Sequence, residues 1–209
     1  MASDRWEESR KRMVELLVHR GITDESVLSA MGSVQRHCFL PPGAGRYADP
    51  YGDYPMEIGC GQTISQPYIV AYMLQKLRLS MGDRVLDIGT GSGYQAAVLY
   101  EMGMEVFSME SVPNLYSQAR EKLPSGLRMK MGDGYLGWPE EAPFQGIVIA
   151  CAPLEVPREL VEQVAPGGRM VLPVGGYFQQ LVVVKRDNDG VTVSRDLPVR
   201  FVPMLRTEQ

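Results

Sequence analysis

A glycine-rich stretch gives the clearest chemical signal in the sequence. Residues 85–94 read VLDIGTGSGY, a β-type run that enters a glycine-rich turn and opens a helix. Glycines in such a turn permit positive φ angles and let a ligand lie against the backbone, while the N–H groups of the following helix attract anions. Gly89, Gly91 and Gly93 are therefore candidate ligand-binding residues. A turn of this kind does not by itself separate one nucleotide class from another.

Acidic residues at the ends of successive strands extend this candidate site. The acids and their neighbouring glycines are Asp87, Glu110, Gly132, Asp133 and Gly134. A carboxylate at the end of the second strand can accept hydrogen bonds from both ribose hydroxyls, and one after the third strand can accept a hydrogen bond from an adenine amino group. Each acid alone has a simpler explanation as a solvated side chain or a helix cap. Three of them at successive strand ends predict one cofactor crevice.

Composition excludes several other kinds of protein. The chain has 21 Lys and Arg against 25 Asp and Glu, a net charge of −4, which lacks the basic surface of a nucleic-acid-binding protein. Its longest apolar stretch, residues 147–154, is too short to span a membrane. Cys38, Cys60 and Cys151 are widely spaced, and with only two histidines we expect no metal site. We expect a cytoplasmic protein whose partners include neither nucleic acid nor a membrane.

The secondary structure that must position these residues alternates between strands and helices. We expect strands at 84–88, 105–109, 127–131 and 146–151, and helices at 66–78, 93–102, 112–122 and 156–165. Such alternation predicts right-handed crossovers, and hence an α/β fold: a Rossmann-like, doubly wound, mostly parallel sheet with helices on both faces.

The two ends of the chain differ from this core. Roughly the first 50 residues have the apolar spacing of helices, with Thr23 or Asp24 as the N-cap of the second one. Residues 46–62, rich in Tyr, Pro, Asp and Gly, are predicted to form a long loop with a functional role. The last segments contain no helix, and antiparallel strands are expected at 169–174, 180–186, 191–195 and 199–204, with a hairpin turn at 187–190.

Several motifs in this chain occur together in one known family. They are GQTISQP at 61–67, VLDIGTGSGYQAAVL at 85–99, GDGYLGWPEEAPF at 132–144, AP at 152–153, PGGRMVLPVG at 166–175 and VRFVP at 199–203. In this order and spacing they resemble the class I S-adenosylmethionine-dependent methyltransferases. Within that class they resemble the protein-L-isoaspartate O-methyltransferases. The GQTIS and VRFVP segments are far more specific to that family than the glycine turn.

The resemblance implies a repair reaction and its cofactor. Members of the family transfer a methyl group from S-adenosylmethionine to the free carboxylate of L-isoaspartyl residues in damaged proteins and peptides, which leaves S-adenosylhomocysteine. A carboxylate of ordinary pKa is already ionised at neutral pH, so no general base is required. The resemblance runs from about residue 30 to 205, and the length of the chain and its lack of a Ser/Gly-rich linker predict a single methyltransferase domain over residues 1–209. Residues 1–65 would form the N-terminal helices and active-site loop, 66–175 the cofactor-binding core, and 176–209 the C-terminal strands.

Three further site residues follow from the resemblance. Ser65 corresponds to the family's active-site serine, and Thr63 supplies a second hydroxyl that can orient a carboxylate without the charge of an arginine. Val202 lies in the strand that lines the peptide groove. The sequence around Ser65 also has a purely structural interpretation, because a serine before Gln66 and Pro67 is a favourable helix N-cap.

The chain departs from the family pattern at two positions and leaves alternatives open. Gln145 stands where the family usually has aspartate, with the expected effect of weakening a fold-supporting hydrogen bond, and Cys60 stands where another residue is usual. A methyltransferase with a different carboxylate or small-molecule acceptor is one alternative, and a cofactor-binding homologue without turnover is another. An NAD-linked dehydrogenase is disfavoured, because the glycine spacing is GxGxG and not GxGxxG.

Overall fold

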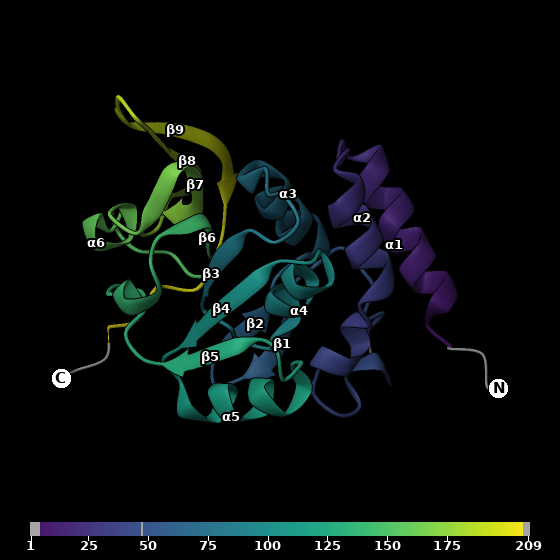
Figure 1. Cartoon of the computed structure of the whole chain (residues 1–209). Coiled ribbons are helices and arrows are strands. Elements are labelled where there is room, and N and C mark those ends of the chain that lie inside the picture. The colour runs from purple at the N-terminus through teal and green to yellow at the C-terminus, as the bar shows by residue number, and fades with distance from the viewer. Residues whose placement is uncertain (1–4, 47, 207–209) are drawn as a thin grey trace.

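A seven-stranded sheet forms the centre of the molecule in the computed structural model, which describes residues 5–46 and 48–206 (Figure 1). The strand order is β5-β4-β3-β6-β7-β8-β9. The strands from β5 to β7 are parallel to their neighbours, whereas β8 and β9 are antiparallel. Their bounds are β3 Arg84–Ile88, β4 Glu105–Glu110, β5 Arg128–Met131, β6 Phe144–Ile149, β7 Val164–Val174, β8 Gln179–Asp187 and β9 Gly190–Val199. The predicted fold class is confirmed.

The direction of winding reverses beside β3, and this places the site. The chain passes from β3 to β4 and β5 on one side, then returns to β6 and β7 on the other. In open α/β sheets, ligands bind outside the carboxyl ends of the strands at such a reversal. The crevice therefore lies where Gly89 follows β3 and Ala150 follows β6.

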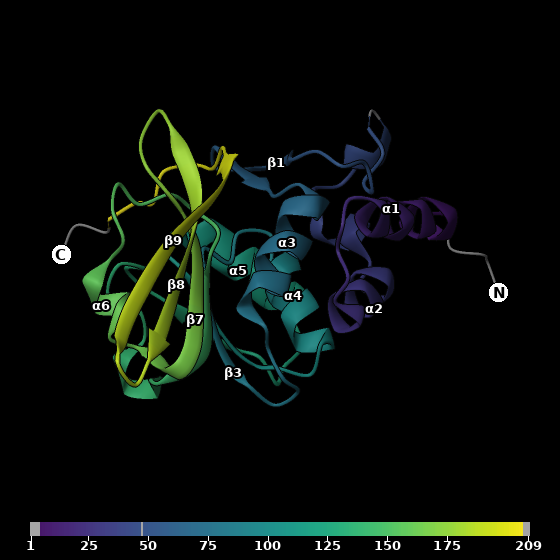
Figure 2. The same cartoon turned by 90° about the horizontal axis from the view of Figure 1, so that it is seen from above.

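The two faces of the sheet are covered unequally. One face packs against α3 and α4, with α1 and α2 stacked outside them, and α5 completes this layer beside β4 and β5 (Figure 2). The other face is covered by α6 and by the segment between β5 and β6, which includes the 3₁₀ turn η3. The helix bounds are α1 Glu7–His19, α2 Glu25–Ser33, α3 Pro67–Leu77, α4 Tyr94–Glu101, α5 Pro113–Lys122 and α6 Arg158–Val161; η3 is Pro139–Glu141. No helix in the described ranges is long and apolar enough to cross a membrane.

The helix expected at 156–165 is wrong in extent. Helix α6 has only four residues, because Val164 already pairs with Phe144 in the sheet. Gln163 lies between the end of α6 and Val164. Its side chain accepts a hydrogen bond from the Trp138 N–H at 2.8 Å and donates one to the Leu136 carbonyl at 2.8 Å. Sheet pairing and this loop anchor end the helix early.

The loop expected at 46–62 is also only partly correct. Strand β1, Met56–Gly59, pairs with β2, Gln62–Ile64, in an antiparallel hairpin. Cys60 and Gly61 form its turn, both with positive φ (53° and 68°). Short strands with a glycine-rich turn escape a periodicity argument, because too few residues alternate to show a pattern.

The C-terminal strands are confirmed except for the last. Strands β8 and β9 meet at the predicted 187–190 turn, but β9 ends at Val199. In the described residues beyond it, 200–206, the only strand-type pairing is an isolated bridge that joins Pro203 to Ala152, so the strand expected at 199–204 is wrong. Pro203 has no N–H to donate to a ladder, which limits regular pairing there. At the other end of the chain, Asp24 is the predicted N-cap and accepts two backbone N–H bonds.

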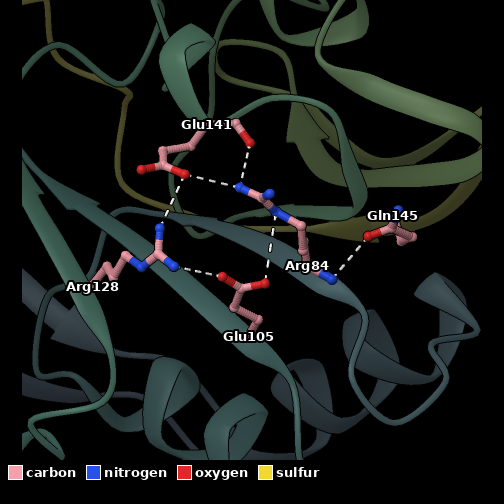
Figure 3. Close-up of polar contacts among 5 residues, drawn as sticks. All are labelled: Arg84, Glu105, Arg128, Glu141 and Gln145. Carbon is pink, nitrogen blue, oxygen red and sulfur yellow. Dashed lines mark hydrogen bonds and ion pairs between the residues drawn. The ribbon is translucent and has the colours of Figure 1, made fainter.

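Gln145 takes part in a polar cluster at the amino ends of the strands, opposite the crevice (Figure 3). Its amide oxygen accepts a hydrogen bond from the Arg84 N–H at 2.9 Å. Arg84 and Arg128 alternate with Glu105 and Glu141 in ion pairs of 2.7 to 3.8 Å. The glutamine therefore makes a hydrogen bond between β3 and β6, and its expected weakness relative to aspartate stays a prediction.

Candidate active site

The glycine turn after β3 is folded back onto β4. The N–H groups of Gly89 and Thr90 both donate to the Met109 carbonyl, at 2.9 and 3.1 Å. Gly89, Gly91 and Gly93 have φ of +86°, +54° and +90°, a region that side-chain-bearing residues rarely adopt. A Cβ added at Gly91 would fill space along the turn that faces the β1–β2 hairpin. The turn thus presents bare backbone toward the crevice.

Glu110 ends β4, as the sequence predicts, and its carboxylate holds the glycine turn in place. One carboxylate oxygen accepts the Gly91 N–H at 2.7 Å, and the other accepts those of Ser111 and Val112 at 2.8 and 2.9 Å. An ionised carboxylate has roughly four acceptor positions, so about one is left for a ligand hydroxyl. The residue expected to bind ribose also supports the turn.

Asp87 lies beneath the turn and away from its surface. Its fully buried carboxylate accepts hydrogen bonds from the Gln95 amide at 2.8 Å and the Ser108 hydroxyl at 2.6 Å. Burial raises the pKa of Asp87 to about 6, although both hydrogen bonds favour its ionised form. Asp87 can influence a ligand only through the turn and helix α4.

A small, mostly apolar cavity lies between the glycine turn and the end of β5. Its lining residues are Ile88, Gly89, Met109, Ser111, Gly132, Gly134, Cys151, Met204 and Leu205. Asp133 adjoins it, and one of its carboxylate oxygens accepts the Tyr135 N–H at 2.9 Å. Gly134 has a packing role as well, since an added Cβ would lie 2.6 Å from Cγ2 of Ile88. The cavity is an apolar slot of about 20 Å³ beside a hydrogen-bond acceptor.

A second cavity, of about 430 Å³, contains every residue predicted to act on the acceptor. We call it the acceptor groove. Its lining residues are Pro55, Thr63, Ser65, Gln66, Ile69, Ala150, Pro198, Val199, Arg200, Phe201 and Val202. Ala150 joins the groove to the cofactor side, because a Cβ added at Gly89 would lie 3.7 Å from Cβ of Ala150. Within the described ranges no acidic residue lines the groove, and Arg200 is its one charged residue.

The hydroxyls of Thr63 and Ser65 are available for a ligand. Neither has a hydrogen-bond partner among the residues that the structure describes, and neither residue is buried. The expectation that Ser65 caps helix α3 is wrong, because the N-cap residue is Gln66, whose side chain makes no capping hydrogen bond. Instead the carboxylate of Asp53, from the preceding loop, accepts the Tyr68 N–H at 2.9 Å.

A buried arginine fixes the backbone beneath the groove. The guanidinium of Arg36 donates to the carbonyls of Pro50 at 2.8 Å, Ser65 at 3.0 Å and Tyr54 at 3.3 Å. Its charge also lies 5.3 Å from the centre of the Tyr94 ring, and burial lowers its pKa. Sequence reasoning missed Arg36 and Asp53, because both act on backbone groups far along the chain, and no local motif marks such contacts.

Together, the strand order, the glycine turn after β3 and the acids that end the next strands define a class I S-adenosylmethionine-dependent methyltransferase. The family model described as Protein-L-isoaspartate(D-aspartate) O-methyltransferase (PCMT) matches residues 8–209. The chain belongs to this family, and it is a protein repair methyltransferase.

Individual relatives agree with this assignment. A protein-L-isoaspartate O-methyltransferase from Opitutus terrae is 50% identical over 94% of this chain and 87% of its own length. One from Gloeobacter violaceus is 48% identical over 92% of this chain and 96% of its own.

Solved structures show the same fold. One protein-L-isoaspartate O-methyltransferase has a TM-score of 0.84 at 27% identity, covering 93% of this chain; the match spans 65% of that longer chain. A crystal structure described as this enzyme from Plasmodium falciparum, in complex with S-adenosyl-L-homocysteine, has a TM-score of 0.81 at 27% identity, covering 95% of this chain and 99% of its own. The cofactor of the family is S-adenosylmethionine.

Proposed function

We propose that the acceptor groove holds the isoaspartyl carboxylate through Thr63 and Ser65, and that the neighbouring crevice holds S-adenosylmethionine. The observation that carries this proposal is spatial: Thr63, Ser65 and Val202, from distant parts of the sequence, line one groove that adjoins the glycine turn. On the cofactor side, the turn glycines, Glu110 and Asp133 provide the binding groups.

The groove suits an anionic acceptor. Bound S-adenosylmethionine supplies an electrophilic methyl group, whose bond to sulfur breaks as the bond to the carboxylate oxygen forms. The two hydroxyls donate neutral hydrogen bonds that orient the carboxylate without pairing its charge. No acidic residue is found in the described lining of the groove, which avoids repulsion. Since the acceptor is ionised at neutral pH, the side chains of the groove need not remove a proton.

The segment after β9 is suited to hold the substrate main chain. Gln179 bonds both the N–H and the carbonyl of Phe201, at 2.7 and 3.1 Å, and so fixes the segment. The N–H groups of Arg200 and Val202 on either side have no hydrogen-bond partner within the described ranges. Recognition through the backbone reads the extra main-chain methylene of isoaspartate and tolerates varied neighbouring residues.

The three segments of the proposed single domain then have distinct roles. Residues 1–65 supply the acceptor hydroxyls, 66–175 the cofactor site, and 176–209 the wall of the groove. Damaged proteins and peptides that contain L-isoaspartate are the proposed partners, and nucleic acid is not. The cysteines are free, which is typical of a reducing compartment and supports a cytoplasmic location.

Matched peptides test the proposed function. The protein is incubated with S-adenosylmethionine and peptides that differ only in isoaspartate or aspartate at one position, and S-adenosylhomocysteine is measured. We expect product with the isoaspartyl peptide only. Equal product with both peptides would point to another carboxylate acceptor, and binding of S-adenosylhomocysteine without any turnover would point to a non-catalytic homologue.

A further inference from the structure

Two aromatic side chains project into solvent at the turn between β7 and β8. Tyr177 is 95% exposed and Phe178 is 86% exposed, and their rings pack edge to face with centroids 5.0 Å apart. Leu154, 78% exposed, lies beside the same turn, since its Cδ2 is 3.5 Å from a Cβ added at Gly176. We call these three side chains the apolar shelf. Contiguous exposed apolar groups mark interaction sites more often than isolated ones do.

The apolar shelf shares part of its wall with the acceptor groove. Its three side chains line a cavity of about 510 Å³ whose wall includes Pro198 and Val199. The same two residues line the acceptor groove. The groove and the shelf therefore lie next to each other at the end of β9. Figure 2 shows the arrowhead of β9, which ends at Val199, directed toward β1.

The shelf and the groove are held in a fixed relation. Gln179 follows the aromatic pair immediately, pairs with Val199 across β8 and β9, and bonds the backbone of Phe201 through its side chain. One residue thus ties the aromatic turn to the groove wall. A preformed surface binds a ligand without the entropic cost of ordering a loop.

The size of the shelf favours a peptide over a second protein surface. A large side chain buries about 150–250 Å² at most, so three of them offer several hundred Å². A stable interface between proteins buries about 1,200–2,000 Å² in total. The shelf matches one or two side chains of an extended substrate.

We propose that the apolar shelf binds a hydrophobic side chain of the substrate polypeptide, a few residues from the isoaspartate. This inference rests on the proposed function of the groove. Val199 and Val202 are three residues apart, about 10 Å in an extended chain, and the shelf lies beyond Val199. The contacting side chain is therefore roughly three to five residues from the isoaspartate. The enzyme favours isoaspartyl sites in segments that expose apolar residues, as unfolded segments do.

The test uses isoaspartyl peptides that differ in a single flanking side chain. Leucine or serine is placed three, four or five residues to either side of the isoaspartate, and KM and kcat are measured separately. With the unmodified protein, leucine on one side should lower KM about fivefold, since it is partly buried on the shelf, while kcat changes little. In the double variant Tyr177→Ser, Phe178→Ser this preference should fall below about twofold.

A matched control separates the shelf from exposed apolar residues in general. Met81, 87% exposed, precedes β3 at the opposite end of the sheet, and Met81→Ser should keep the full leucine preference. An isoaspartyl tripeptide, too short to reach the shelf, should be methylated equally by the unmodified protein and the double variant. Failure of the unmodified protein with every isoaspartyl peptide, the longer serine peptides included, would contradict the proposed function itself.

Two results would overturn the shelf while leaving the proposed function intact. One is equal KM for leucine and serine peptides when the tripeptide is methylated normally. The other is a dimer in sedimentation velocity that the double variant converts to a monomer with its leucine preference unchanged. The second result would make the shelf an interface between copies of the chain.

Discussion

On the cofactor side of the site, acidic side chains are already bonded to the protein, whereas the hydroxyls of the acceptor groove have no partner among the described residues. Glu110 accepts three backbone N–H bonds, and Asp87 accepts two bonds from side chains. Thr63 and Ser65 face the groove with their hydroxyls free. Hydrogen bonds within the protein hold the cofactor side in place, whereas the acceptor groove keeps two hydroxyls to which a ligand can bond.

The cofactor side and the acceptor groove also differ in charge. Carboxylates lie beside and beneath the turn where we propose that a positively charged sulfonium compound binds, and opposite charges attract most strongly in a partly dry site. Among the residues that the structure describes, the acceptor groove has no acidic lining residue and one positive charge, Arg200. An anionic carboxylate would be repelled by an acid there. The comparison predicts that changes on one side alter cofactor affinity and changes on the other alter turnover.

The largest expected effect is on cofactor binding. Gly91→Val adds a branched side chain where φ is +54° and where a Cβ alone would lie 3.5 Å from Cδ1 of Ile58. Binding of S-adenosylhomocysteine should disappear in isothermal titration calorimetry. Gly82→Val is the matched control, because Gly82 has φ of +87°, nothing within 4 Å of an added Cβ, and a position at the opposite end of β3. Unchanged affinity in folded Gly91→Val would remove the turn from the cofactor site.

A large loss of stability is expected when Arg36 is replaced. Arg36→Met leaves three carbonyls without their donor, and the free energy of unfolding should fall by about 3 kcal/mol or more in urea denaturation. Arg120→Met, at an exposed site on α5, should change it by less than about 0.5 kcal/mol. Similar small changes in both variants would show that Arg36 does not hold the groove backbone.

The buried acid on the cofactor side makes stability depend on pH in an unusual direction. Because the pKa of Asp87 is raised from 3.8 to about 6 in the folded protein, its contribution to stability is fully present below about pH 4 and is lost as pH rises through 6. Relative to Asp87→Asn, the unmodified protein should therefore lose unfolding free energy between these values, on the order of 3 kcal/mol. Asp189→Asn, in the β8–β9 turn, is the control.

One result would contradict this predicted pH dependence of stability. If the difference in unfolding free energy between the unmodified protein and Asp87→Asn stayed constant from pH 4 to 7, burial would not raise the pKa of this carboxylate.

The smallest expected effect concerns Asp133. Asp133→Ala should weaken S-adenosylhomocysteine binding several-fold, as expected for one lost hydrogen bond of about 0.5–1.5 kcal/mol. Asp133→Asn keeps an acceptor oxygen and should restore most of the affinity. Equal affinity in the unmodified protein and a folded alanine variant would make Asp133 only the partner of the Tyr135 N–H.

Sequence reasoning located the cofactor side better than the acceptor side, for physical reasons. Glycine turns and strand-end acids follow buried strands whose periodicity is strong, so Glu110 and the β3 turn lie where the pattern predicts them. The groove is assembled from the β1–β2 hairpin and the segment after β9, which have little periodicity. There the motifs of the family, and not the residue pattern, identified Ser65 and Val202.

Long-range polar contacts could not be predicted from the sequence. The helix start near Ser65 is capped by Asp53 from another segment, and so a favourable local cap was assigned wrongly. Helix α6 is shortened because β7 begins pairing at Val164. In both places a tertiary contact outweighs a local preference.

The central claim is that the cofactor side determines cofactor affinity and the acceptor groove determines turnover. Its most direct test is to remove both hydroxyls of the groove. Thr63→Val combined with Ser65→Ala should lower the single-turnover rate of S-adenosylhomocysteine formation on an isoaspartyl peptide at least about tenfold, because the carboxylate loses its two donors. Affinity for S-adenosylhomocysteine, measured by calorimetry, should stay within about twofold, since neither hydroxyl lies on the cofactor side. Thr192→Val combined with Ser194→Ala, on the exposed strand β9, is the matched control and should change neither quantity. An unchanged rate in the Thr63 and Ser65 variant, or an equal fall in rate and affinity, would contradict the division of the site into two regions.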